Sequence, residues 1–156
     1  MLKRALFAVC GVMFLAMQPA AAQSAPAAVL PTYDAELAKP LGGDDNGMRA
    51  YVLVILKTGP NKVADPAERK KMFQGHFANM ERLAAEKKLA FAGPLDGVEG
   101  RRGIFILATP DIELAKTYVA TDPVIVNGEM VAEYHKLYGS AALMMVNDVH
   151  NKIRKK

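Results

Sequence analysis

The feature that most constrains the fold is the order of strand and helix signals along residues 48–138. Four short runs are rich in β-branched and aromatic residues, and two longer segments open on an aspartate close to a proline, as helix N-termini often do. In chain order we expect a strand at 49–56, a helix from 65 to about 88, strands at 89–92 and 103–108, a helix at 111–119 and a strand at 129–138. This pattern predicts an α+β protein with one folded domain.

The order strand, helix, strand, strand, helix, strand is typical of the ferredoxin-like βαββαβ arrangement, in which two helices cover one face of a four-stranded antiparallel sheet. An extra helix is expected from Ala141 to about Lys152, capped by Ser140, so that residues 139–156 form a C-terminal helix and a basic tail. Because the first and third strands are apolar on both sides, the uncovered face of the sheet needs a partner. We expect a homodimer through this sheet face, with the C-terminal helix able to pack on the neighbouring copy.

The first 22 residues have the three parts of a secretory signal peptide. Lys3 and Arg4 form a basic start, an apolar run covers residues 5–17, and Ala20-Ala21-Ala22 is a small-residue cleavage site. The rival interpretation is a membrane anchor, but the apolar run is shorter than the roughly 20 residues that a spanning helix needs. We therefore expect cleavage near Ala22, export to the periplasm or beyond, and no stable membrane anchor afterwards.

Residues 23–47 are rich in alanine, proline, glycine and aspartate and show neither a helical nor an alternating apolar period. Such a composition favours a flexible tether. A short helix around residues 33–37 is the alternative within this segment. The folded α+β domain is expected to span residues 48–138.

Cysteine and charge exclude several classes of protein. The only cysteine, Cys10, lies in the signal, so the mature chain has no disulfide, no thiolate nucleophile and no cysteine metal ligand. Removal of Lys3 and Arg4 lowers the net charge from +4 to +2, and no large basic cluster remains. A nucleic-acid partner is therefore not expected.

His76 is the first candidate for chemistry. On a helical wheel it lies among Met72, Phe73 and Met80, on or beside the stripe that meets the sheet, where a partly buried imidazole needs a hydrogen-bond partner. The preceding Gly75 costs a helix roughly 1 kcal/mol relative to alanine, which suggests close backbone approach or room for a ligand. A packed core histidine beside a packing glycine is the structural alternative.

Asp122 is the second candidate. It could accept a hydrogen bond from one ring nitrogen of His76 and fix the tautomer, leaving the other nitrogen to take a proton from a substrate. This hypothesis requires the two groups to lie within about 6 Å of each other. The alternative is ordinary Asp-Pro turn chemistry, in which the carboxylate accepts from nearby backbone N–H groups.

These segments carry a resemblance to a known family. In order, they are Gly75-His76-Phe77-Ala78-Asn79-Met80 through Leu89, Ala92-Gly93-Pro94-Leu95, the apolar strand 103–108, and Thr121-Asp122-Pro123. Together they resemble the YCII-related family of dimeric α+β barrel proteins. The resemblance implies that His76 and Asp122 are an active-site dyad, and relatives on the same barrel include dehalogenating and isomerising enzymes of aromatic breakdown. The loop at 57–64 departs from the family pattern because it lacks the usual acidic residue near its start.

Other candidates are weaker. His135 is expected to face the same side of the sheet as Glu133 and Leu137, and His150 to be solvated. A metal site needs about three or four ligands, and no paired ligand spacing is present, so no metal and no cofactor is expected. Arginines that could hold a carboxylate-bearing substrate are Arg49, Arg101 and Arg102, although arginines in a hairpin loop are usually just exposed.

Three functional hypotheses remain. The first is a small cofactor-free enzyme that uses His76 and Asp122 as a general base on a small organic molecule, with a pocket lined by Phe73, Met80, Pro94 and Tyr134. The second is a ligand-binding module with the same pocket and no turnover. The third is a structural dimer in which the histidine is merely packed.

Overall fold

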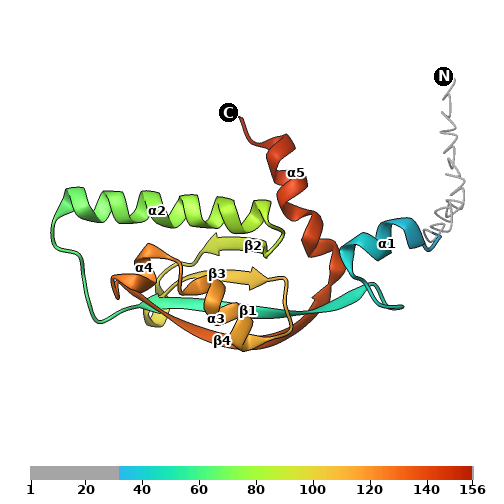
Figure 1. Cartoon of the computed structure of the whole chain (residues 1–156), viewed down its shortest axis with the longest axis horizontal. Coiled ribbons are helices and arrows are strands. Elements are labelled where there is room, and N and C mark those ends of the chain that lie inside the picture. Colours follow the sequence, from blue (N-terminus) through green and yellow to red (C-terminus); the bar gives the residue numbers. More distant parts are fainter. Residues whose placement is uncertain (1–31, 156) are drawn as a thin grey trace, which may run out of the picture. The chain divides into compact units, whose positions relative to one another are not determined.

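A computed structural model describes residues 32–155, so the expected signal peptide and residues 23–31 of the expected tether lie outside the described part of the chain. The elements are α1 (Ala35–Leu41), β1 (Met48–Thr58), α2 (Pro66–Ala85), β2 (Leu89–Pro94), η1 (Val98–Gly100), β3 (Arg101–Leu107), α3 (Ile112–Val119), α4 (Pro123–Val126), β4 (Met130–Ser140), η2 (Ala141–Met145) and α5 (Val146–Ile153). Figure 1 shows these elements coloured along the chain.

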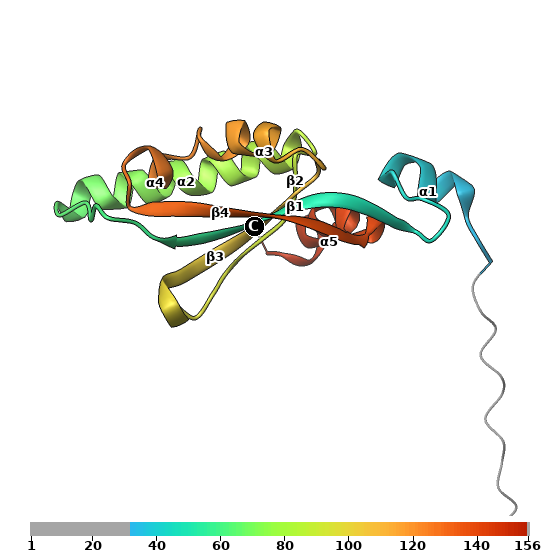
Figure 2. The same cartoon turned by 90° about the horizontal axis from the view of Figure 1, so that it is seen from below.

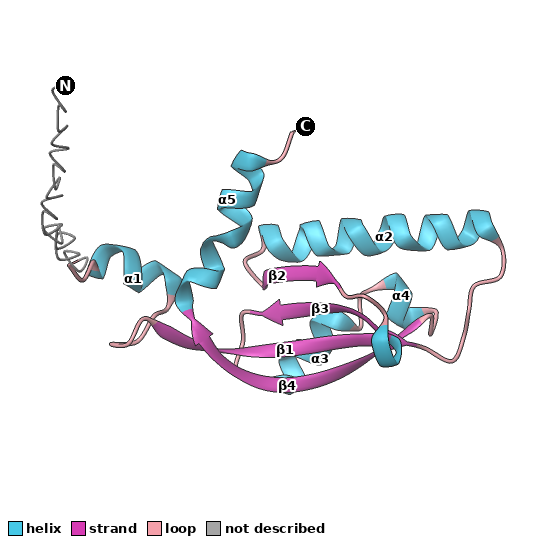
Figure 3. Cartoon of the chain, turned by 180° about the vertical axis from the view of Figure 1, so that it is seen from behind, coloured by secondary structure: helices cyan, strands magenta, loops and turns pink. Residues whose placement is uncertain are grey.

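The four strands form one antiparallel sheet in the order β2-β3-β1-β4 (Figure 3). This is the ferredoxin-like order, in which the first and third strands lie in the middle. Val54 of β1 pairs with Phe105 of β3 on one side and Tyr134 of β4 on the other. The predicted βαββαβ order is confirmed.

The main core lies between the sheet and the helices on one of its faces. Figure 2 shows α2, α3 and α4 on the same side of the sheet. Because successive strand residues point to opposite faces, alternate residues of the central strands enter this core. Its buried members are Val52, Val54, Leu56, Met72, Leu83, Leu89, Phe105, Leu107, Ala115, Val119, Val124 and Met130.

Helix α2 begins as its sequence predicts and ends earlier. The Asp65 carboxylate accepts from the Glu68 N–H, and Pro66 takes the first helical position. The expected end near residue 88 is wrong because Lys87 has a positive φ of 56°, and the Lys88 N–H turns back to the Leu83 carbonyl. That left-handed residue closes the helix by a turn of the kind that satisfies its last carbonyls.

Within the segment expected as a tether, the alternative of a short helix agrees with the structure, although the helix covers residues 35–41 instead of 33–37. Residues 35–41 form α1, capped at the start by the Asp34 side chain and at the end by Gly42, whose φ is 68°. The helix is held to the domain because Arg49 donates a hydrogen bond of 2.8 Å to the Leu41 carbonyl. With seven residues, α1 is too short to show a clear apolar period, so composition was a poor guide there.

The C-terminal segment differs from the single helix expected after Ser140. Ser140 does cap the turn at Ala142, but residues 141–145 are a 3₁₀ helix and only α5 is α-helical. Asn147 then donates to the carbonyls of Leu89 and Ala90, which covers part of the edge strand β2. Among the helices in residues 32–155, none is long and apolar enough to cross a membrane.

Candidate active site

His76 and Asp122 meet in the interior of the domain. The His76 Nδ1 lies 2.9 Å and 2.8 Å from the two carboxylate oxygens of Asp122, well within the distance that the dyad hypothesis requires. The histidine is 7% exposed and the aspartate 0%. Because an ionised carboxylate can only accept, Nδ1 is the donor, and the neutral ring keeps its lone pair on Nε2.

A close approach of two helices creates this contact. Asp122 caps α4, accepting from the Val124 N–H at 3.1 Å, and Pro123 begins that helix. The sequence offered an Asp-Pro turn after the helix expected at 111–119 and did not predict α4. Helix α2 passes so close that a Cβ on Gly75 would lie 2.9 Å from Pro123 Cγ. Gly75 therefore provides close approach of the backbone, one of the two roles suggested for it.

A hydrogen-bond network holds the carboxylate from the other side. The Asn79 Nδ2 donates to Asp122 Oδ2 at 3.4 Å. Its own Oδ1 accepts from Arg82 at 2.8 Å and from the Thr121 hydroxyl at 3.0 Å, which fixes the amide with its donor toward Asp122. Sequence reasoning missed Asn79 as a site residue, although its position three residues after His76 puts both on one face of α2.

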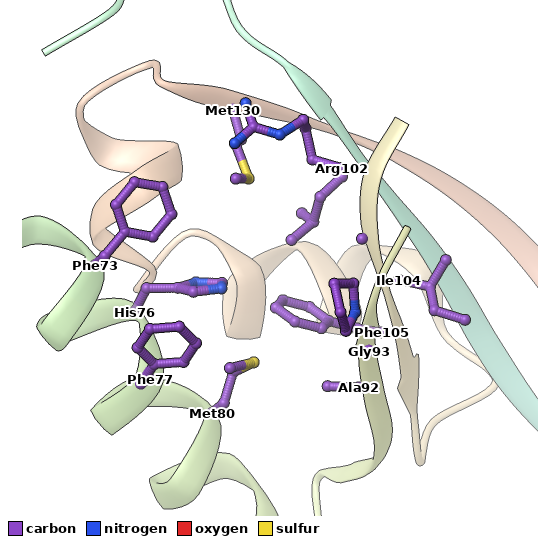
Figure 4. A pocket seen from close by; sticks show the side chains of 13 residues that line it. Phe73, His76, Phe77, Met80, Ala92, Gly93, Arg102, Ile104, Phe105 and Met130 are labelled. Carbon is purple, nitrogen blue, oxygen red and sulfur yellow. The ribbon is translucent and has the colours of Figure 1, made fainter. Parts of the chain in front are cut away.

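Three phenylalanine rings surround the imidazole. Phe105 stacks with His76 at 6.0 Å between centroids, while Phe73 and Phe77 approach at 6.1 Å and 5.5 Å. Within residues 32–155 no protein group hydrogen-bonds Nε2. The ring projects from α2 into the space between the helix and the sheet (Figure 4).

That space is a cavity of about 350 Å³ between α2, β2 and β3. Its lining is mostly apolar, with one base and one cation: Leu56, Phe73, His76, Phe77, Met80, Ala92, Gly93, Pro94, Arg102, Gly103, Ile104, Phe105 and Met130. Phe73, Met80 and Pro94 line it as predicted. Tyr134 does not; it packs against the core, and burial raises the pKa of its hydroxyl.

The remaining predicted residues lie elsewhere. His135 is exposed on the opposite face of the sheet and contacts Glu133 at 2.7 Å, and His150 is exposed on α5. Arg49 is occupied by the carbonyls of Leu41 and Ala108. Within residues 32–155, no group of three or more histidine, cysteine or acidic side chains is placed to hold a metal ion.

A second buried carboxylate lies near the cavity. Glu129 is 4% exposed; it accepts two hydrogen bonds from Arg69 and one from the Val63 N–H. The Arg69 guanidinium, with help from that N–H, holds the pKa of the Glu129 carboxyl below its usual range, although burial acts in the opposite direction. Glu129 thereby joins the loop before α2 to the start of β4.

Fold and site together define a small α+β domain with a histidine–aspartate pair in the wall of an apolar cavity. Residues 50–135 match the family model of the YCII-related domain, and the chain belongs to this family.

The chain is also similar to a solved structure, a 5-chloro-2-hydroxyhydroquinone dehydrochlorinase from Burkholderia phenoliruptrix AC1100 in complex with 2,5-dihydroxybenzoquinone. The two are 17% identical, the match covers 54% of this chain and 90% of that chain, and the TM-score is 0.39. No curated protein matches this chain.

Proposed function

We propose that the protein is a small cofactor-independent enzyme in which His76, oriented by Asp122, is the general base and acid for a small organic substrate. One observation carries this proposal: a buried carboxylate holds one nitrogen of an imidazole whose ring faces an apolar cavity. A packed core histidine would need no such cavity beside it.

The arrangement supports transfer of one proton in each direction. The Nε2 lone pair takes a proton from a C–H or O–H bond of the substrate, and the bonding electron pair stays on the substrate. Asp122 remains ionised and stabilises the positive ring that forms. Return of the proton from Nε2 to another atom completes an isomerisation, and its transfer to a departing group completes an elimination.

The surroundings favour this use of the base. The apolar, largely aromatic wall offers few groups that would hold water beside Nε2, which favours delivery of its proton to the substrate. At about 350 Å³ the cavity is at the small end of ligand sites, which suits a substrate with about one ring.

The test measures exchange of substrate protons for deuterium. A panel of small phenols, lactones and carboxylic acids is incubated with the protein in D₂O, and each compound is monitored by ¹H NMR. The wild-type protein is expected to convert at least one compound or to introduce deuterium into it, and His76→Gln to slow this by about 10²-fold or more. His150→Gln, which replaces an exposed histidine on α5 outside the cavity, is the control. Unchanged rates in His76→Gln would overturn the proposal, and binding without exchange would favour the ligand-binding module.

We further propose that the mature protein is a homodimer through the open sheet face. Leu53, Ile55, Ile104 and Ile106 alternate with the core residues of β1 and β3 and are half-exposed on that face. A sheet face in contact with water is usually polar, so this one favours a second copy.

Export is the last part of the proposal and depends on the sequence of residues 1–22. The expected result is an N-terminus at residue 23 in protein recovered from the periplasm or the medium, read by mass spectrometry. An uncleaved chain in the cytoplasm would contradict it.

A further inference from the structure

Arg102 is the one charged side chain that lines the apolar cavity, apart from any charge on His76. Within residues 32–155 its guanidinium forms no ion pair and donates no hydrogen bond. In Figure 4 the side chain extends from β3 toward Met130, while His76 enters the same cavity from α2. Arg102 is half-buried, and its unpaired guanidinium stays accessible beside the apolar wall, where it can bind an anionic ligand.

A β-bulge directs Arg102 to this side of the sheet. On β3, Gly103 pairs with Leu56 and Arg101 pairs with Lys57, so Arg102 is an extra residue without a partner on β1. In a regular strand Arg102 would share the open face with Ile104 and Ile106. Bulges re-aim single side chains in this way and are common beside active sites.

The neighbouring charges leave this end of the cavity positive. Arg69 lies nearby but is already bound to Glu129 through two hydrogen bonds. Both arginines line an adjoining groove, in which Glu129 is the one carboxylate for two guanidinium groups. The adjoining groove adds Lys62 and contains no further acidic residue.

We propose that Arg102 binds the carboxylate of the ligand, and that the natural ligand is a small aromatic or alicyclic carboxylic acid. The planar guanidinium suits a carboxylate through two parallel hydrogen bonds. The apolar lining takes the ring, and the anchored end fixes which ring atom meets His76 Nε2. This inference rests on the proposed function because it names the substrate class of the same site.

The test compares charged and neutral molecules of the same shape. Benzoate with benzamide, and phenylacetate with phenylacetamide, are titrated into ¹⁵N-labelled protein, and dissociation constants are taken from NMR shift changes. The wild-type protein is expected to bind at least one acid about tenfold more tightly than its amide. Arg102→Gln should bring that ratio close to one, and Arg102→Lys should leave it in between.

Arg101→Gln is the matched control, because Arg101 is the adjacent residue, is exposed and pairs with Glu99. It should keep the wild-type ratio. Equal affinities for acid and amide in the wild-type protein, an unchanged ratio in Arg102→Gln, or no binding of either pair would each overturn the inference. Failure of the proposed function would give a different result. The exchange rate of His76→Gln would equal that of the wild-type protein, while the preference for acid over amide would still be lost in Arg102→Gln.

Discussion

His76 Nδ1 lies 2.8 Å from Asp122 Oδ2, across 46 positions of sequence. The same carboxylate caps α4 through the Val124 N–H. One buried group thus fixes both the ring of the candidate base and the start of a helix, so the site and the fold share a residue. Substitutions at Asp122 can separate the two roles because asparagine caps helices about as well as aspartate.

Asp122→Asn is expected to keep the cap and lose the ionised acceptor. Its amide can also offer an N–H to Nδ1, which favours the tautomer with the proton on Nε2. Exchange activity should fall on the order of 10³-fold or more. The ¹⁵N shifts of the His76 ring should show the change of tautomer without any substrate.

Asp122→Ala removes the cap as well. It should unfold more easily than Asp122→Asn by about 1 kcal/mol, measured in urea, because the Val124 N–H loses its side-chain acceptor. Equal stability of the two variants would mean that the cap contributes little.

Gly75→Ala is expected to destabilise the protein, although helix propensity alone predicts that alanine stabilises this position. Alanine would stabilise an unhindered helix by about 1 kcal/mol, but the new Cβ would lie 2.9 Å from Pro123 Cγ. Overpacking of this kind costs about 1–3 kcal/mol and should also separate His76 from Asp122.

The double variant Gly75→Ala with Pro123→Ala is the control, because it removes the Pro123 Cγ with which the new Cβ would clash. It should recover much of the stability lost in Gly75→Ala, which a double-mutant cycle in urea measures as a coupling energy. Additive effects would show that Gly75 is not kept for this approach.

The sequence predicted most of what depends on local patterns. Alternation gave the four strands, and the Asp65-Pro66 signal located the start of α2. The approach of His76 to Asp122 was predicted from residue type and family resemblance. The sequence offered Arg102 only as one of three arginines that could hold a carboxylate. Strand periodicity places Arg102 on the open face of the sheet, away from the cavity, and a bulge leaves no clear mark in a single sequence. Asn79 was missed because its role depends on the contact of α2 with Thr121 and Asp122.

Glu129→Gln should lower stability in a pH-dependent way. The pKa of Glu129 is lower in the folded protein than in the unfolded chain, mainly because of Arg69. The carboxylate therefore stabilises the fold above the unfolded pKa of about 4.3, and that contribution is lost as the pH falls through the folded value.

The free energy of unfolding of Glu129→Gln should be about 1–3 kcal/mol below wild type near neutral pH, and the difference should shrink as the solution becomes acidic. Glu113→Gln, which removes an exposed pair with Lys116, should change stability by less than about 1 kcal/mol. A difference for Glu129→Gln that is constant with pH would contradict the assignment.

Ile55→Asp is expected to convert the proposed dimer into a monomer. Ile55 lies opposite Ile104 and Glu133 on the open sheet face and is not part of the core cluster. The new carboxylate should therefore lie in the proposed interface and leave the packing of the core unchanged. Analytical ultracentrifugation should give a mass near two chains for the wild-type protein and one chain for the variant. Leu114→Asp, on the exposed side of α3, should keep the wild-type mass. A wild-type protein that sediments as a monomer would mean that the open face has another use.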